Sequence, residues 1–414
     1  MSKPYPALFV SLLALTVTAS AQEEGEPREP LDPLTGPTNE ARADVMELAP
    51  PVHGEELRAR ARAAYQKGFD FLVATQNEDG SWGSHDPKAA FLKDFGFRTG
   101  NRGSQDGVRL ACTAIVCKAL LRKEDRSPAE QQALERGTQA LLGLEKFAYH
   151  YGESFNTWGY GYKLDYLCDY LESRPAEGLR KRALAAAQVC VEGLRTYQQA
   201  DGGWNYYAGP MNDGESMSFN TGNFAEALHR ASTLGVTVPE GMIEDAKKLL
   251  VRMVTERGGV VYDARFLHTP DSVNELSSAA RTAAVTESLA HLGVFGLPEL
   301  QRSLKVFNEG ENWLEDGRKL IQPHTAVHQV SGYFFFYGYH YFSEFLARMG
   351  EAAPVERWER NAWTMVRTQE DDGCWWDTAA ADYGDKWGTG FALLVLQRYF
   401  DHCPVESEPR DSEE

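Results

Sequence analysis

The sequence contains no long apolar segment beyond its N-terminal stretch, which excludes a membrane-spanning helix in the rest of the chain. It lacks the Gly-x-Ser-x-Gly turn, the phosphate-binding P-loop and the His-Glu-x-x-His pair that are typical of several large hydrolase and nucleotide-binding classes. Basic residues are outnumbered, with 42 lysines and arginines against 60 aspartates and glutamates. Nucleic acid is therefore not an expected partner, because binding to it needs a basic face.

The first residues have the features of a signal peptide. Lys3 supplies a positive charge, Ala7 to Thr18 is apolar, and Ala19-Ser20-Ala21 is a small-residue cleavage signature. The apolar run is too short to span a bilayer. We therefore assign residues 1–21 to a signal peptide cleaved near Ala21, and we expect a secreted or periplasmic protein.

Two acidic segments flank the remainder of the chain. Residues 22–55 are rich in Glu and Pro, residues 403–414 are rich in Glu, Pro and Ser, and both segments are poor in aromatic residues. Such segments cannot bury enough apolar surface to order themselves, so both are predicted to be disordered. Residues 56–402 are then expected to form one folded repeat domain.

Helical periodicity dominates this domain, and charged amphipathic helices alternate with helices that are apolar on most sides. The apolar helices are expected to be buried inside the amphipathic ones. Their starts fall near residues 108, 160, 223, 277, 330 and 388. Six such pairs describe an all-α fold, a closed α/α toroid, because an open solenoid would need polar-faced terminal repeats. One outer helix, Pro298 to Phe307, is expected to be short and to be followed by a long loop from Gly310.

Three turns repeat one pattern, in which a Gln precedes an acidic-Gly turn and then a Trp. The glycines can adopt the left-handed conformation that ends a helix, and an indole brings a large apolar area and one donor. A structural role, tying one helical hairpin to the next, is therefore predicted for the Gln and Trp residues. These are Gln76, Trp82, Gln199, Trp204, Gln369 and Trp375.

These turns, each followed by a Thr- and Ala-rich apolar helix, resemble the QW-type repeats of the squalene-hopene cyclase and protein prenyltransferase superfamily. The resemblance covers roughly residues 57 to 400 and implies an α/α barrel with a central cavity. The Asp-x-Asp-Asp acid motif of the cyclases is missing, and the positions comparable to the prenyltransferase zinc ligands hold Asn220, Ser278 and Lys386. The resemblance therefore implies a divergent member without either catalytic motif, and neither a metal nor another cofactor is expected.

Ligand contacts are expected at the rim where the loops from outer to inner helices would meet, since loops on a rigid scaffold commonly carry function. Polar and aromatic residues near the starts of the inner helices are the candidates. They are Asn156, Trp158, Tyr160, Asn220, Asn223, Arg281, His328, Tyr333, Tyr337 and Trp387. A buried Arg281 would need a partner, for which Asp271 or Glu287 is available.

Four carboxylates fall inside apolar helices, at Asp165, Glu226, Glu287 and Glu344. They could pair for acid–base chemistry, although hydrogen bonding between helices is the commoner reason for such residues.

The sequence leaves three hypotheses for function. The first is an exported binding protein that holds an apolar or amphipathic ligand in the cavity without the parent families' chemistry. The second is an exported polysaccharide lyase or glycosidase, and the third is a terpenoid cyclase or prenyltransferase-type enzyme with unrecognised catalytic residues. Two facing carboxylates would favour the second hypothesis, whereas a cavity walled only by aromatic and small residues would favour the first. The ligand, whether a small molecule, a lipid or a glycan, is left open.

Overall fold

The computed structural model describes residues 50–83, 102–144, 155–206, 215–268, 275–319, 334–377 and 384–403. All of these residues belong to one compact unit, Glu47–Glu414. None of the helices in these ranges is both long and apolar enough to cross a membrane. The assignment of residues 1–21, and almost all of the 22–55 and 403–414 assignments, fall outside the described ranges and stay predictions.

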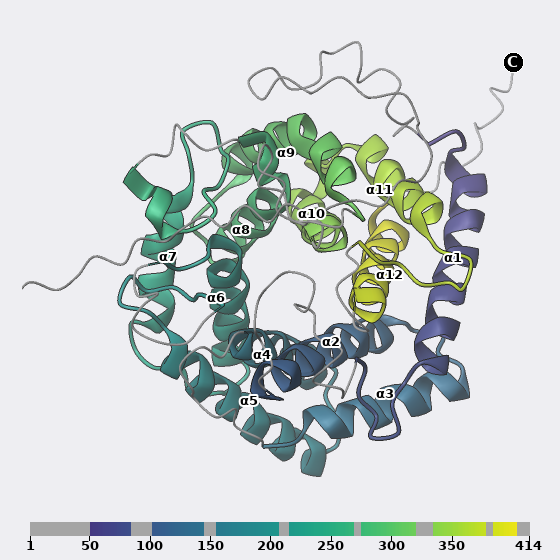
Figure 1. Ribbon diagram of the computed structural model, residues 1–414, viewed down its shortest axis with the longest axis horizontal. Helices are drawn as coiled ribbons and strands as arrows, with labels where there is room; N and C mark the ends of the chain where they lie inside the picture. The colour runs from purple at the N-terminus through teal and green to yellow at the C-terminus, as the bar shows by residue number, and fades with distance from the viewer. Residues whose placement is uncertain are drawn as a thin grey trace, which may run out of the picture. The chain divides into compact units, whose positions relative to one another are not determined.

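Six inner helices form a closed ring. Each packs against the next, and the last packs against the first, so the ring has no free edge (Figure 1). In chain order they are α2 (Arg102–Arg122), α4 (Asn156–Glu172), α6 (Ser218–Thr233), α8 (Ala279–His291), α10 (Phe335–Met349) and α12 (Gly384–His402).

Six outer helices surround this ring. Each packs on an inner helix: α3 on α2, α5 on α4, α7 on α6, α9 on α8, and both α1 and α11 on α12. They are α1 (Gly54–Ala74), α3 (Pro128–Leu141), α5 (Glu177–Tyr197), α7 (Met242–Met253), α9 (Leu297–Gly317) and α11 (Val355–Thr368). The predicted α/α toroid is therefore confirmed.

The pattern of exposure explains the two rings. The outer helix α11 carries its buried residues on one face, whereas the inner helix α12 is buried over most of its length. An amphipathic helix can satisfy one apolar stripe against a neighbour, but a helix that is apolar all round must be enclosed. The sequence pattern thus decides which helix of each pair lies inside.

The outer helix α9 corrects one prediction. It runs from Leu297 to Gly317, well past the expected end at Phe307, so the expected loop from Gly310 begins inside a helix. Trp313 and Leu314 are buried there, and the fully buried Glu311 pairs with Arg357 of α11 at 3.0 Å. These tertiary contacts hold a helix in a stretch whose polar composition and glycine suggest a loop.

The three Trp turns share one hydrogen-bonding frame. The backbone amide of each Trp donates to a threonine of an inner helix, at 3.0 Å for Trp82 and Thr113, and at 2.9 Å for Trp375 and Thr389. Each indole Nε1 donates to a carbonyl ten residues earlier, as in Trp204 to Leu194 at 2.7 Å. All three rings are buried, so each Trp joins the end of an outer helix to an inner helix.

The glutamine of the second turn is Gln198, not the predicted Gln199. Gln76 Nε2 donates to the carbonyls of Gly80 and Ala133, at 2.9 and 2.8 Å. Gln198 makes the equivalent bonds to Gly202 and Met242, at 2.8 and 2.9 Å. Gln199 accepts from local groups of the following loop instead. Gln198 and Gln199 are adjacent, so the sequence alone does not show which of them corresponds to Gln76. In the structure, the side chain six residues before the Trp is the one that faces the next outer helix.

A fourth turn makes the same backbone hydrogen bonds, although it contains neither the Gln nor the Trp of the other three. Gly258 is left-handed, with φ of +95°, and the amide of Thr255 donates to the Gly259 carbonyl at 2.7 Å. Val260 occupies the Trp position, and its amide donates to Thr282 at 3.1 Å. The backbone and the threonine, rather than the indole, are therefore the constant parts of the repeat.

Candidate functional site

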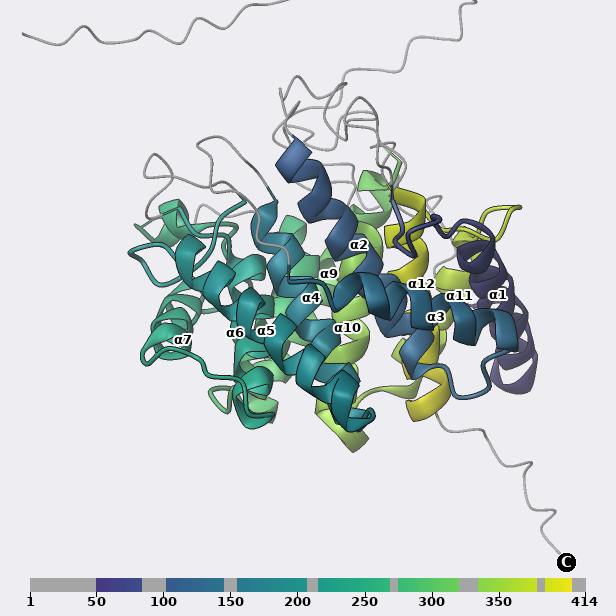
Figure 2. The ribbon, with the colours of Figure 1, turned by 90° about the horizontal axis from the view of Figure 1, so that it is seen from below.

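A cavity of about 450 Å³ lies inside the inner ring. Its lining comes from all six inner helices, mainly from their C-terminal halves. The inner helices α2 and α12 begin at the same end of the ring (Figure 2). The residues that line the cavity lie mostly toward the other ends of the inner helices. The rim at the helix starts, where the sequence led us to expect ligand contacts, is therefore not where this cavity is found.

Charged residues enter the cavity at two levels, one helical turn apart. Residues four positions apart on a helix share a face, so each inner helix from α2 to α10 contributes to both levels. The first level consists of Lys118, Asp165, Glu226, Glu287 and Glu344. The second level consists of Arg122, Asp169, Arg230, His291 and Arg348, with Arg398 from α12. The four carboxylates that the sequence singled out thus stand together at the first level.

Three of the carboxylates in the cavity are held by cations. Arg230 donates to Asp165 at 2.7 Å, and it also binds Asp169. Burial alone would raise the pKa of Asp169, but Lys118, Arg122 and Arg230 outweigh it and hold that pKa well below its usual range. Glu344 accepts from Arg122 at 2.9 Å and from Arg398 Nε at 3.0 Å. These two arginines likewise overcome burial and hold its pKa low.

The Asp169→Asn variant is expected to lower the free energy of unfolding at pH 7 by about 3 kcal/mol, because it leaves buried arginines short of a countercharge. The depressed pKa means that this contribution is present above the unfolded pKa of about 3.9 and is lost as the pH falls further. Urea unfolding at pH 7 and at pH 3 measures both values. Glu172→Gln, on the same helix but with a half-exposed side chain, is the control, and equal losses in the two variants would contradict the prediction.

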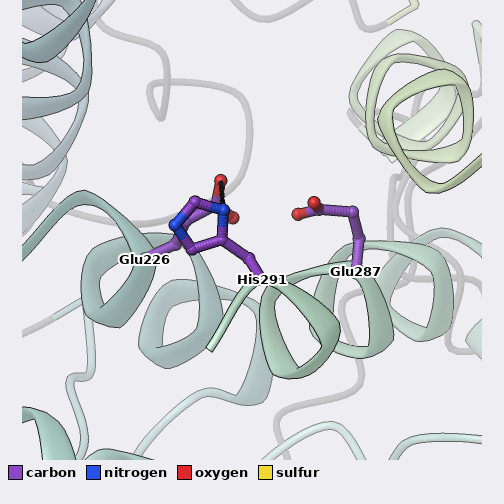
Figure 3. Close-up of side chains that lie close together, drawn as sticks. All are labelled: Glu226, Glu287 and His291. Carbon is purple, nitrogen blue, oxygen red and sulfur yellow. Dashed lines mark ion pairs between the residues drawn. The ribbon is translucent and has the colours of Figure 1, made fainter. Parts of the chain in front are cut away.

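Glu226 of α6 and Glu287 of α8 lie close together in the wall of the cavity (Figure 3). Oxygens of the two carboxyl groups and a nitrogen of His291 all lie within 4.8 Å of one another. Glu226 accepts from the Ser288 hydroxyl at 3.2 Å. Burial and then the neighbouring Glu226 raise the pKa of Glu287 well above its usual range, although Arg348 opposes the shift. Glu287 therefore holds its proton to a higher pH than an ordinary glutamate, and it does so beside a second carboxyl group.

These same three residues have the spacing of a metal site, but a guanidinium already supplies the positive charge. Arg348 Nη2 lies 2.8 Å from Glu287 Oε1 and 3.0 Å from His291 Nδ1. A cation bound by Glu287 and His291 would have to displace Arg348. The arrangement fits a carboxyl pair with a built-in counter-ion better than an open metal site, whose ligands must face a free coordination position.

EDTA is accordingly expected to leave the melting temperature unchanged. A tightly bound structural ion would make a visible difference, because a ligand at 100 times its Kd stabilises the fold by about 2.7 kcal/mol. Differential scanning calorimetry with and without EDTA, followed by zinc or calcium, makes the measurement. A fall in melting temperature with EDTA that one of these ions restores would establish a metal site here, and Glu226→Gln should then abolish the restoration.

The residues predicted from the sequence are distributed differently from the expectation. Of the ten candidates, Asn223 lines the cavity, and its side chain donates to the Tyr337 hydroxyl at 3.1 Å. Asn156 instead donates to the Tyr197 hydroxyl of the outer helix α5 at 3.0 Å. Tyr160 also packs against Tyr197, so both side chains point away from the ring interior.

The side chain of Arg281 binds the backbone of the protein itself. Its guanidinium donates to the carbonyls of Val260 and Ser277, at 2.7 and 2.9 Å, and burial lowers its pKa to about 10. Glu287, proposed as its partner, pairs with Arg348 instead. The alternative partner Asp271 and the candidates His328 and Tyr333 lie outside the described residues.

Five aromatic rings meet inside the ring on the side toward the helix starts. Trp158 of α4 packs against Trp387 of α12, with ring centroids 5.3 Å apart, and its Nε1 donates to Asn220 at 2.9 Å. Phe391 joins Trp387 at 5.2 Å and Tyr337 at 6.0 Å. We call Trp158, Tyr162, Tyr337, Trp387 and Phe391 the aromatic plug. Its rings are all buried, so they pack on one another rather than line the cavity broadly.

The basic residues that line the cavity, including Arg230 and Arg348, were not predicted from the sequence. A signal for them exists, since Arg230, His291 and Arg348 each follow one of the singled-out carboxylates by one helical turn. Without knowledge of which face of each helix points inward, these positions read as ordinary helix-terminal bases.

No protein-family model and no curated protein matches the chain. Solved structures are similar to it. A glycosidase aligns with a TM-score of 0.51 and 13% identity, covering 84% of this chain and 99% of that one. The type II terpene cyclase MstE from Scytonema aligns at 0.48 and 14%, covering 83% and 99%, respectively. A family 76 glycoside hydrolase from a bovine Bacteroides thetaiotaomicron strain aligns at 0.48 and 12%, covering 83% and 77%. At such identities the likeness concerns the fold, the α/α toroid.

Proposed function

We propose that this protein is an exported glycoside hydrolase in which Glu287 is the general acid and Glu226 the nucleophile. The observation that carries the proposal is the buried carboxyl pair in the cavity wall. Two neighbouring carboxyl groups, of which one is kept protonated by its surroundings, supply both an acid and a base. Arg348, from the second level, donates to Glu287 and so holds one member of the pair in place.

The chemistry requires two steps. Glu287 would donate its proton to the glycosidic oxygen while the Glu226 carboxylate attacks the anomeric carbon, so that the carbon–oxygen bond to the leaving sugar breaks. Water would then displace Glu226 and return a proton to Glu287. Oxygens of the two groups lie within 4.8 Å of each other, which is shorter than the roughly 6.5–9.5 Å separation of inverting glycosidases and so favours a retaining mechanism.

The charge of the cavity supports a neutral substrate. Its lining includes five lysines and arginines and six acidic residues, so charges of the two signs nearly balance. A polyhydroxylated, uncharged molecule suits such a wall of donors and acceptors. Tyr162 and Tyr341 also line the cavity. The apolar-ligand hypothesis has less support, since a charged wall would be desolvated without compensation.

A substrate screen tests the proposal. The purified protein would be incubated with p-nitrophenyl glycosides and with neutral plant, fungal and bacterial glycans, and products followed by chromatography. We expect hydrolysis of at least one neutral glycan with retention at the anomeric carbon. Absence of turnover across the screen, together with a co-purifying lipid in native mass spectrometry, would instead support the apolar-ligand hypothesis.

A further inference from the structure

We infer that the cavity is a blind pocket that accepts the end of a glycan chain and releases one monosaccharide at a time. This inference rests on the proposed glycosidase function, and it specifies which bond of the substrate is cleaved. It follows from three features of the cavity, namely its closed end, its open end and the depth of the carboxyl pair.

The closed end is the aromatic plug. Trp158 and Tyr162 of α4 meet Trp387 and Phe391 of α12, with Tyr162 and Trp387 centroids 5.4 Å apart. Tyr337 of α10 continues the contact from the other side, 4.6 Å from Tyr341. Rings from three helices thus fill the interior beyond the cavity. A polymer cannot pass through this layer without displacing close-packed aromatic side chains.

The open end lies at the C-terminal ends of the inner helices. There the Glu172 side chain is 50% exposed and the Arg348 side chain 41% exposed, and both line the cavity. By contrast, the first-level residue Glu287 is 3% exposed. On α8 and α10 the exposure falls from the second level inward, from 20% at His291 to 3% at Glu287 and from 41% at Arg348 to 18% at Glu344, as it does along a pocket with one mouth.

The depth of the carboxyl pair sets the size of the unit removed. Tyr162, Asn223 and Tyr341 each stand three residues before a first-level carboxylate on the same helix, so they form a floor about one turn below the pair. A turn of helix rises about 5.4 Å, which is comparable with one monosaccharide ring. One sugar thus fits between the floor and the bond facing Glu287, and the rest of the chain extends toward the mouth.

An enzyme that cuts within a chain needs a groove open at both ends, because polymer continues on both sides of the cleaved bond. The aromatic plug stands on the inner side of the pair. Hydrolysis at a chain end is the mode compatible with this shape, irrespective of which neutral sugar the chain contains.

The test uses a five-unit linear oligosaccharide of the glycan that the screen identifies, in three forms: unmodified, blocked at the non-reducing end, and reduced to the alditol at the other end. We expect monosaccharide as the first product from the unmodified form. One of the two modified forms should be cleaved at least 100-fold more slowly, which identifies the end that enters. Early appearance of two- and three-unit products, with equal rates on all forms, would overturn the inference while leaving the glycosidase function intact.

Substitution of Tyr341, one of the floor residues, tests the depth of the pocket independently. Tyr341→Ala removes a ring from the floor and should add disaccharide to the early products, whereas Tyr341→Phe keeps the ring and should release monosaccharide alone. Unchanged products from a folded Tyr341→Ala protein, judged by circular dichroism, would contradict the assigned depth. No turnover of any glycan by the unaltered protein would overturn the proposed function itself, and not merely the mode of attack.

Discussion

The Glu287→Gln variant is expected to lower the rate of glycan hydrolysis by roughly 10²–10⁴-fold, the usual contribution of a positioned general acid. Glutamine has nearly the same shape and can still accept from Arg348, so the pocket should stay intact while the transferable proton is lost. Steady-state kinetics on the substrate found by the screen would measure the effect. Glu177→Gln, an exposed carboxylate on the outer helix α5, is the matched control and should leave the rate unchanged.

The pH dependence of this variant separates a catalytic role from a structural one. Because the pKa of Glu287 is raised in the folded state, the acid keeps its proton to a higher pH than an ordinary glutamate, and activity should fall on the alkaline side of that pKa. The same shift acts on stability: the contribution of Glu287 is complete below its unfolded pKa of about 4.3 and is lost as the pH rises through its folded pKa. Glu287→Gln should therefore be more stable than the unaltered protein at alkaline pH. An unaltered rate in the variant would remove Glu287 from the mechanism.

The Trp204→Ala variant is expected to lower the free energy of unfolding by roughly 3–5 kcal/mol, as large-to-small changes of buried aromatic residues do. The indole is fully buried, donates to the Leu194 carbonyl and packs edge-to-face on Phe224 with centroids 6.0 Å apart. Its removal leaves an empty space between α5 and α6 and an unpaired carbonyl. Chemical denaturation with a helical signal measures the change.

Trp376→Ala serves as the control for this experiment. Trp376 directly follows a turn tryptophan but is only partly buried, and its ring faces the Lys319 ammonium at 4.1 Å. Loss of that contact should cost about 0.5–1 kcal/mol. If Trp204→Ala were as mild as the control and impaired glycan binding instead, Trp204 would be a ligand contact rather than a joint between hairpins.

The toroid could be predicted from the sequence because its causes are local. The alternation of amphipathic and apolar helices assigns each helix to the outer or the inner ring, and each Trp turn is completed by a carbonyl ten residues earlier in the chain. Errors arose where tertiary contacts override local pattern. The second half of α9 is helical because the buried Glu311 pairs with Arg357, and Gln198 rather than Gln199 meets the next outer helix.

The candidate site could not be predicted to the same degree. Rim residues such as Asn156 and Arg281 were chosen for their place at helix starts, yet they face outward or bind backbone carbonyls. The carboxylates inside apolar helices were noticed one at a time. Their grouping depends on which face of each helix turns inward, and only closure of the ring determines that.

Glu287 and Glu344 show where local information ends. Both are glutamates in apolar inner helices at the same level of one cavity, Glu287 buried and Glu344 half-buried. Arg122 and Arg398 hold the pKa of Glu344 low, whereas Glu226 and burial raise that of Glu287. The sequence by itself determined that a ring of helices would form and that acids would lie within it. Which acid keeps its proton was decided by the tertiary structure, because the charges that set each pKa come from other helices, brought close by ring closure.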